Sequence, residues 1–266
     1  MARFGAYFAA VALVIVGAGF YFRENYRPRT NPEPAKIVEG KWLEHLHSQN
    51  PKVAEEAARQ LKDLGASALP QIRRALQDPG ADTATKKAAL KAAGMLGTTA
   101  SPAVADVAAL LPNPELTEEA AVALSFLGRD AYSPLRLAAS SEDPVVRREA
   151  VRSLGKLRER APLDSRAVVP LLLQGLTDTD ARVRSVAATY LGILHDDGPS
   201  VVPALIETLQ DEDPEVRAAA ATALGSFEPQ ATLALPALRK AAGDRDENVA
   251  REAGLSIVKL QSSSRR

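Results

Sequence analysis

From Lys41 onward, apolar residues recur with the period of an α-helix and are interrupted by short polar stretches. In the segment 214–225, one helical face carries the apolar residues Val216, Ala219, Ala220, Ala223 and Leu224. A second apolar run, 202–209, precedes it, and the polar residues 210–213 separate the two. This pattern predicts a pair of helices joined by a turn.

Local signals predict where these helices begin and end. Asp213 followed by Pro214 is typical of an N-cap and a first helical position, and Asp143-Pro144 repeats this signal. Pro203 is expected in the opening turn of the first helix, where its missing N–H costs nothing. Gly225 is expected to end the second helix in the left-handed conformation that glycine adopts most easily.

The same pair of helices recurs along the chain with a period near 33 residues. A Leu-Gly pair begins at Leu64, Leu96, Leu127, Leu154, Leu191 and Leu224. A proline recurs independently at Pro70, Pro102, Pro134, Pro170, Pro203 and Pro236. Two markers with a shared period predict about seven helix pairs, which bury their apolar faces by stacking on one another.

The segment 202–225 resembles a HEAT repeat of the short kind found in phycobilin-lyase-type HEAT-like proteins. Asp178 and Arg184, and likewise Asp211 and Arg217, match the aspartate and arginine positions of that family, which implies a structural ladder between repeats. The resemblance implies an all-α fold, an α-solenoid in which about seven HEAT-like helix pairs form a right-handed superhelix over residues 41–262. It is strong from about Tyr132 and weak before it. The last unit, with Ala250 in place of the arginine, is expected to be a terminal cap, and residues 263–266 a disordered tail.

The N-terminus has a different character. Residues 4–22 carry no charge, have aromatic residues at both ends and are flanked by Arg3 and Arg23. As a helix, this run would be about 28 Å long, close to the thickness of the bilayer core, so residues 1–22 are predicted to form a single transmembrane anchor in contact with lipid. A cleaved signal peptide is the main alternative, and a buried core helix is a weaker one.

Residues 23–40 contain Pro28, Pro32 and Pro34 and are predicted to form an extended linker. The side of the membrane that the solenoid faces stays open. The excess of arginine after the apolar run favours the cytoplasm, whereas a short N-terminal tail with one arginine is also typical of a signal anchor that exports the domain.

Overall composition excludes several classes of protein. The chain has no cysteine, so it is neither a disulfide scaffold nor a thiolate metal site, and its 33 basic residues equal its 33 acidic ones. A neutral chain lacks the general attraction to phosphates on which most nucleic-acid binders depend. Only five aromatic residues lie beyond the N-terminal run, which also argues against stacking on bases.

No constellation of catalytic residues is apparent, and we predict no catalytic residue, no cofactor and no metal ligand. His45 and His47 are two residues apart and would point to different sides of a helix. His195 lies beside Asp196 and Asp197, where carboxylates could hold a hard cation, but a polar turn is the better interpretation.

The second helices offer a candidate binding surface, because in HEAT-like proteins these helices line the concave face. Relative to the valine that opens each helix, the second and sixth following positions should face outward together. The candidate partner-binding residues at these positions are Arg148, Arg152, Thr189, Thr222 and Arg251. Earlier units place Leu90 and Gly94, then Ala121 and Ser125, at the same positions.

We therefore expect a membrane-tethered HEAT-repeat scaffold or adaptor that binds a protein partner without catalysis. The alternative is an enzyme subunit resembling a phycobilin-lyase-like HEAT protein, which would hold a small molecule or a chromophore protein in its concave groove. The cations between Arg147 and Arg160 could serve an acidic protein surface or lipid headgroups, or could simply be a solvated helix face.

Overall fold

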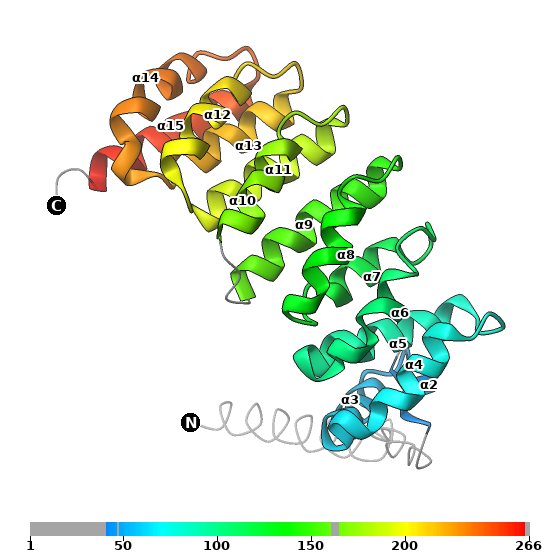
Figure 1. The fold of residues 1–266 in the computed structure, drawn as a ribbon. Coiled ribbons are helices and arrows are strands. Elements are labelled where there is room, and N and C mark those ends of the chain that lie inside the picture. Colours follow the sequence, from blue (N-terminus) through cyan, green and yellow to red (C-terminus); the bar gives the residue numbers. More distant parts are fainter. Residues whose placement is uncertain (1–40, 47, 161–164, 264–266) are drawn as a thin grey trace, which may run out of the picture.

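The computed structural model describes residues 41–46, 48–160 and 165–263, and these residues form helices and turns with no strand. The predicted anchor (4–22), the linker (23–40) and His47 lie outside these residues. Within the described part of the chain, no helix combines the length and the apolar character needed to cross a bilayer. The chain from Trp42 to Ser263 folds as a stack of helix pairs, from α2 and α3 at one end to α14 and α15 at the other (Figure 1).

Each of the seven described pairs consists of a first helix, a turn and a second helix. The pairs are α2 (Trp42–His45) with α3 (Pro51–Leu64), α4 (Leu69–Gln77) with α5 (Thr83–Leu96), α6 (Val104–Ala108) with α7 (Thr117–Leu124), α8 (Tyr132–Ala138) with α9 (Pro144–Arg160), α10 (Ser165–Gly175) with α11 (Ala181–Leu194), α12 (Gly198–Thr208) with α13 (Pro214–Leu224), and α14 (Ala231–Ala241) with α15 (Glu247–Ser263). Short 3-10 helices connect several pairs: η1 (Gly65–Ala68), η2 (Gly97–Ala103), η3 (Arg129–Ala131) and η4 (Glu228–Gln230).

The predicted start of α13, in the sixth helix pair, is confirmed, and the same kind of N-cap recurs in other pairs. Asp213 caps α13 by accepting hydrogen bonds from the backbone amides of Glu215 and Val216, and Pro214 is the first helical residue. Asp143 caps α9 in the same way, accepting from the amide of Val145 at 2.8 Å. These caps satisfy amides that have no partner within the helix, so each one fixes where a second helix begins.

The prolines of the first helices lie deeper than expected. Pro170, Pro203 and Pro236 are interior residues of α10, α12 and α14, and each helix begins five residues earlier. An interior proline deprives the carbonyl group four residues before it of its hydrogen-bond donor. All three prolines are exposed, so water can hydrate the carbonyl that each one leaves without a donor.

The prediction for Gly225 is correct in position, since α13 ends at Leu224, but wrong in the conformation of the glycine. Its φ of −63° is right-handed, and Gly155 and Gly192 lie inside α9 and α11 rather than after them. Left-handed glycines do occur in the first three units, at Gly65, Gly97 and Gly128. In the later units the glycine serves close packing instead: a Cβ on Gly192 would lie 2.6 Å from the Cα of Ala223 in the next unit.

The core is built from small and aliphatic side chains, as the low aromatic content requires. Each second helix packs on the second helix of the following unit, along the series α5, α7, α9, α11, α13 and α15. Buried alanines such as Ala187 and Ala220 let these helices approach closely. The second helices therefore form one continuous layer, and its outer side is a single surface that spans several units.

Candidate protein-binding surface

The second-helix face is the outer side of this layer, and its most basic part lies on α9. Arg148 and Arg152 are half-buried there, on either side of the fully buried Glu149. Arg148 donates a 2.8 Å hydrogen bond to one oxygen of Glu149, and Arg152 approaches the other oxygen to 3.6 Å. Both arginines are therefore anchored from beneath by a carboxylate, which fixes their position and neutralises part of their charge.

The remaining three residues predicted for this surface occupy matching positions on the next helices. Thr189 of α11 and Thr222 of α13 are exposed, and each hydroxyl donates to a carbonyl of its own helix. The hydroxyl of Thr222 also lies 3.2 Å from Glu252 of α15, beside Arg251, which is 64% exposed. The structure thus arranges these residues across three consecutive helices that pack side by side.

The predicted register fails in the second and third units. Leu90, Ala121 and Ser125 were expected to face outward but are fully buried. These units lack the opening valine and have Ala88 and Glu119 in its place, and α7 ends at Leu124, so Ser125 already lies beyond the helix. In α7, Glu119 is only half-buried, so counting from it shifts every later position on the helix. In α5, Ala88 is itself buried, and Leu90 is buried as well because the buried side of this helix is wider than the pattern predicts.

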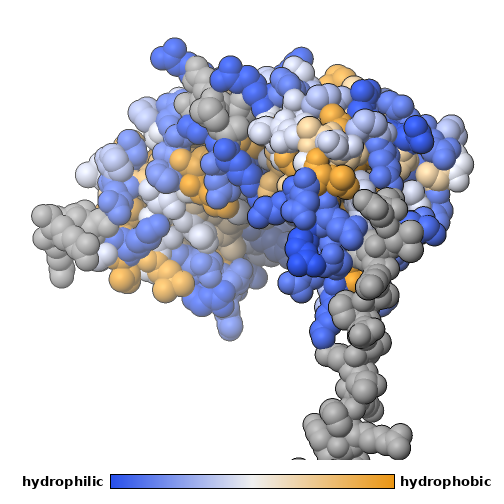
Figure 2. All heavy atoms as spheres, turned by 90° about the horizontal axis from the view of Figure 1, so that it is seen from below, coloured by the Kyte–Doolittle hydropathy of each residue, from blue (hydrophilic) through white to orange (hydrophobic). Residues whose placement is uncertain are grey.

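This part of the second-helix face instead contains an apolar groove that the sequence analysis missed. The groove lies between α5 and α7 and has a volume of about 650 Å³. Met95 and Phe126 line it and are 47% and 39% exposed. The sequence signal was available, because Phe126 is one of five aromatic residues after the N-terminal run and Met95 is the only methionine besides Met1. In the space-filling view, hydrophobic patches interrupt a mainly hydrophilic surface (Figure 2).

Arginine and aspartate side chains link the later units to one another. Arg184 of α11 donates two 2.8 Å hydrogen bonds to the carboxylate of Asp211 in the next unit, and it also bonds the carbonyl oxygen of Asp178 in its own unit. Arg217 makes the same bidentate contact with Asp244. These are the residues for which the family resemblance implied a ladder.

The ladder also extends one unit further toward the N-terminus, where Arg147 bonds Asp178. Each ladder aspartate accepts a further hydrogen bond, from the amide two residues later: Asp180, Asp213 and Asp246 respectively. Each carboxylate is therefore bonded both by the arginine of the preceding unit and by its own turn. The ladder fixes the turn inside each unit and the contact between units at the same time.

The ladder contacts alter the ionisation of these groups. Hydrogen bonds from Arg147 and Arg217 hold the pKa values of Asp178 and Asp244 below the ordinary range. Burial opposes the ionisation of Asp211, but the hydrogen bonds from Arg184 and from the turn outweigh it, so the pKa of Asp211 is also lowered. A carboxylate whose pKa is lowered by folding stabilises the fold above its unfolded pKa.

Acid should therefore weaken the solenoid through the ladder. The contribution of Asp211 is complete above its unfolded pKa of about 4 and is lost as the pH falls through its lower folded value. Urea unfolding at a series of pH values should show that Asp211→Asn is less stable than wild type near neutral pH and loses less on acidification. Asp63→Asn, a change of an exposed carboxylate on α3, is the matched control. Identical acid losses in all three proteins would contradict this assignment.

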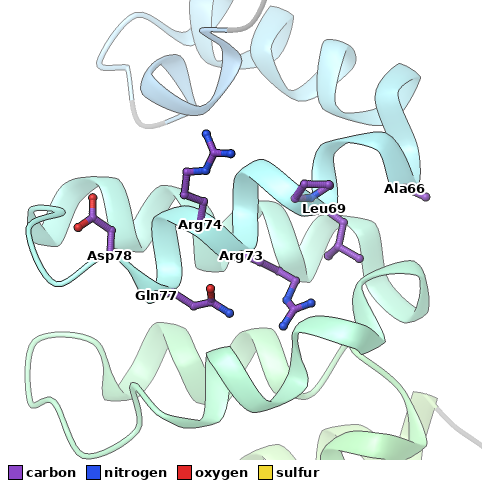
Figure 3. Close-up of a pocket in the computed structure, with 7 residues that line it drawn as sticks. Ala66, Leu69, Arg73, Arg74, Gln77 and Asp78 are labelled. Carbon is purple, nitrogen blue, oxygen red and sulfur yellow. The ribbon is translucent and has the colours of Figure 1, made fainter.

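A second depression, of about 640 Å³, lies along α4, on the other side of the helix pair (Figure 3). The residues that line it lie in η1 and α4, except Asp78, which directly follows α4, and Arg73 and Arg74 point to opposite sides of the helix. The guanidinium group of Arg73 is bonded to Asp106 of α6 at 2.6 Å, and Gln77 bonds the same carboxylate. These polar groups hold two first helices together and do not converge on a ligand.

Histidine and acidic side chains do not converge either. In the part of the chain that the structure describes, no three of them are grouped in a way that could hold a metal ion. His195 is exposed, and the neighbouring Asp196 pairs with Arg158 of α9 at 2.9 Å. The segment 195–197 is thus a turn tied to the preceding unit by an ion pair.

Comparison with known proteins places this architecture in a family. A sequence profile of HEAT repeats matches residues 40–125 and 169–258, which together make up more than half of the chain. The chain belongs to the HEAT-repeat family. A profile of the PBS lyase HEAT-like repeat matches residues 146–178, which overlap the second HEAT segment at 169–178. A search of curated proteins gave no match.

Several solved structures align with this chain. Kap121p aligns with a TM-score of 0.60 and 16% identity over 79% of this chain and 27% of its own length. YibA of E. coli aligns with a TM-score of 0.51 and 17% identity over 85% of this chain and 93% of its own length. A chain in the complex of CpcE and CpcF of phycocyanin lyase from Nostoc sp. PCC7120 aligns with a TM-score of 0.49 and 23% identity over 58% of this chain and 98% of its own length. The likeness to Kap121p and YibA shows a shared fold and nothing further, because both identities are below 25%.

Proposed function

We propose that this protein is a HEAT-repeat scaffold that binds a protein partner on its second-helix face and performs no catalysis itself. The observation that carries this proposal is the continuity of that face from α9 to α15. Arg148, Arg152, Thr189, Thr222 and Arg251 lie on adjacent, tightly packed helices, so their spacing is fixed before any partner binds. A preorganised surface avoids the entropic cost of ordering loops on binding.

The chemistry of this face supports a protein partner. Arginine, tyrosine and methionine are enriched in protein interfaces, and the face combines the two arginines of α9 with Tyr190 of α11. Tyr190 packs against Gly155 of α9, and burial raises its pKa, while Arg152 opposes that rise. The half-buried ring thus sits among charged groups, an arrangement typical of interface anchors.

We propose further that residues 4–22 tether this scaffold to a membrane. The proposal rests on the uncharged, aromatic-flanked run in the sequence, whose length matches a bilayer. The side of the membrane on which the scaffold works is part of the same question. Reporters active only inside or only outside the cytoplasm, fused after Arg266, distinguish the two orientations.

Photo-crosslinking in native membranes tests the scaffold and the tether together. A photoreactive amino acid at Thr189 or Thr222 should crosslink a partner, whereas the same amino acid at the exposed Ser133 or Thr232, on first helices, should not. Thr189→Glu combined with Thr222→Glu should abolish the crosslink formed from Arg251 without changing the melting temperature. A chain lacking residues 1–22 should keep the partner but move with it to the soluble fraction.

Exposed threonines suit this experiment better than the arginines of α9. Replacing Arg148 and Arg152 by glutamate would leave the buried Glu149 without its cations, so lost binding could not be separated from lost folding. Equal crosslinking from the first and second helices would contradict the proposed surface. Partner capture that survives the combined change of Thr189→Glu and Thr222→Glu would contradict it as well.

A further inference from the structure

The groove between α5 and α7 has the features of an anchoring site for one or two apolar side chains. Its floor is formed by Gly94, which has no side chain, and by Ala123 of the facing helix. Val122, Met95 and Phe126 form its apolar walls, and the fully buried Leu90 also lines it. Methionine is a flexible and polarisable wall residue that adapts to apolar groups of different shapes.

The two ends of the groove differ in charge. At one end Lys87 pairs with Glu119 at 2.6 Å, and further along Lys91 donates to the carbonyl oxygen of Leu46, so both lysines are engaged within the protein. At the other end the guanidinium group of Arg160 lies 3.9 Å from the centre of the Phe126 ring. It donates to the hydroxyl oxygen of Ser125 and, among the residues that the structure describes, forms no ion pair with a carboxylate.

Arg160 is also the last of four cations spaced four residues apart on α9, after Arg148, Arg152 and Lys156. Residues at this spacing follow one side of a helix. The apolar groove therefore opens directly onto a basic stripe on the neighbouring helix, and Phe126 and Arg160 mark the junction between them. A guanidinium group stacked on a ring keeps its donors available for a carboxylate.

We propose that this junction binds a linear segment of a partner protein in which an aliphatic or aromatic side chain stands next to acidic residues. The apolar side chain occupies the groove, and the carboxylates pair with Arg160 and the stripe on α9. This inference rests on the scaffold function proposed above and names the chemistry of the partner. The apolar side chain of the partner segment matches the groove in polarity, and its acidic residues are opposite in charge to the stripe.

A library of random linear peptides, displayed on phage and selected against the full-length chain in detergent, tests the proposal without assuming a sequence. The selected peptides should share an apolar residue followed or preceded by acidic residues. Their affinity should fall about tenfold or more for Gly94→Leu, which fills the groove, and for Arg160→Glu, which reverses the charge at its end. Gly254→Ala, on the last helix where an added methyl group meets nothing, is the matched control.

The selection has outcomes that overturn the proposal. Basic or purely polar consensus peptides would do so, and so would acidic peptides that bind Gly94→Leu and wild type equally. Failure to enrich any peptide would also overturn it, while the crosslinking from Thr189 would still decide the scaffold function separately. If the selected peptides match residues 207–215 of this chain and no other sequence, the occupant is the acidic turn of a second copy, and the proposed partner is wrong. If Gly94→Leu melts below wild type, Phe126→Ser replaces it as the groove variant.

Discussion

Replacing Arg184 by alanine should lower the free energy of unfolding by about 3 kcal/mol, because it removes one member of a buried ion pair. The side chains of Arg184 and Asp211 are only 10% and 11% exposed. Without the guanidinium group, the carboxylate of Asp211 keeps its charge in a site that water barely reaches. The carbonyl oxygen of Asp178 also loses a donor. The first effect acts at the junction between the fifth and sixth units, and the second acts in the turn of the fifth unit.

Urea denaturation followed by circular dichroism measures this loss. Arg239→Ala, on the exposed side of α14, is the control and should change stability by no more than about 0.5 kcal/mol. Arg184→Lys should fall between alanine and wild type, because an ammonium group keeps the charge but cannot contact both carboxylate oxygens and the carbonyl in one plane. An alanine variant as stable as the Arg239 control would show that the ladder does not hold the units together.

The loss should also be uneven along the chain. In a repeat protein each unit contacts only its neighbours, so a weakened junction lets the parts on either side unfold separately. Amide hydrogen exchange in Arg184→Ala should therefore accelerate most in α12 to α15, which lie beyond the broken contact. A uniform acceleration would mean that the solenoid still unfolds as one unit.

Much of this fold could be predicted from sequence because its signals are local. The cap formed by Asp213 depends on two amides within three residues, and the apolar stripe of α13 depends only on helical geometry. The period of the Leu-Gly pairs showed that the helix pairs repeat. The family resemblance then identified Asp178, Arg184, Asp211 and Arg217 as ladder residues, and Arg184 and Asp211 contact each other between units although they are 27 positions apart in the chain.

What could not be predicted depends on contacts between helices. The sequence does not say that Leu90 and Ser125 are buried, because their exposure depends on how α5 and α7 rotate about their axes, and those units lack the valine that sets the register elsewhere. The groove beside Phe126 has the same origin. It exists because Gly94 faces Ala123 across a helix contact, and neither residue signals a partner 29 positions away.

Gly192 shows how such a contact constrains a single residue. Gly192 holds the repeat position at which Gly225 was expected to end a helix, but Gly192 lies within α11 and packs against α13 of the next unit. A Cβ at this position would lie 2.6 Å from the Cα and 2.7 Å from the Cβ of Ala223. Those atoms belong to a helix backbone and a methyl group, which have no rotamer to change, so the two helices would have to move apart.

Gly192→Ala should therefore destabilise the protein by about 3 kcal/mol, at the upper end of the range for overpacked cores. Gly254→Ala in α15 makes the same chemical change inside another second helix, where a Cβ meets nothing within 4 Å. It should stabilise the protein by about 0.5–1 kcal/mol, since alanine favours the helix over glycine. Thermal and urea unfolding of both variants measure the difference. If Gly192→Ala stabilises the protein as Gly254→Ala does, contact between units does not require glycine at position 192.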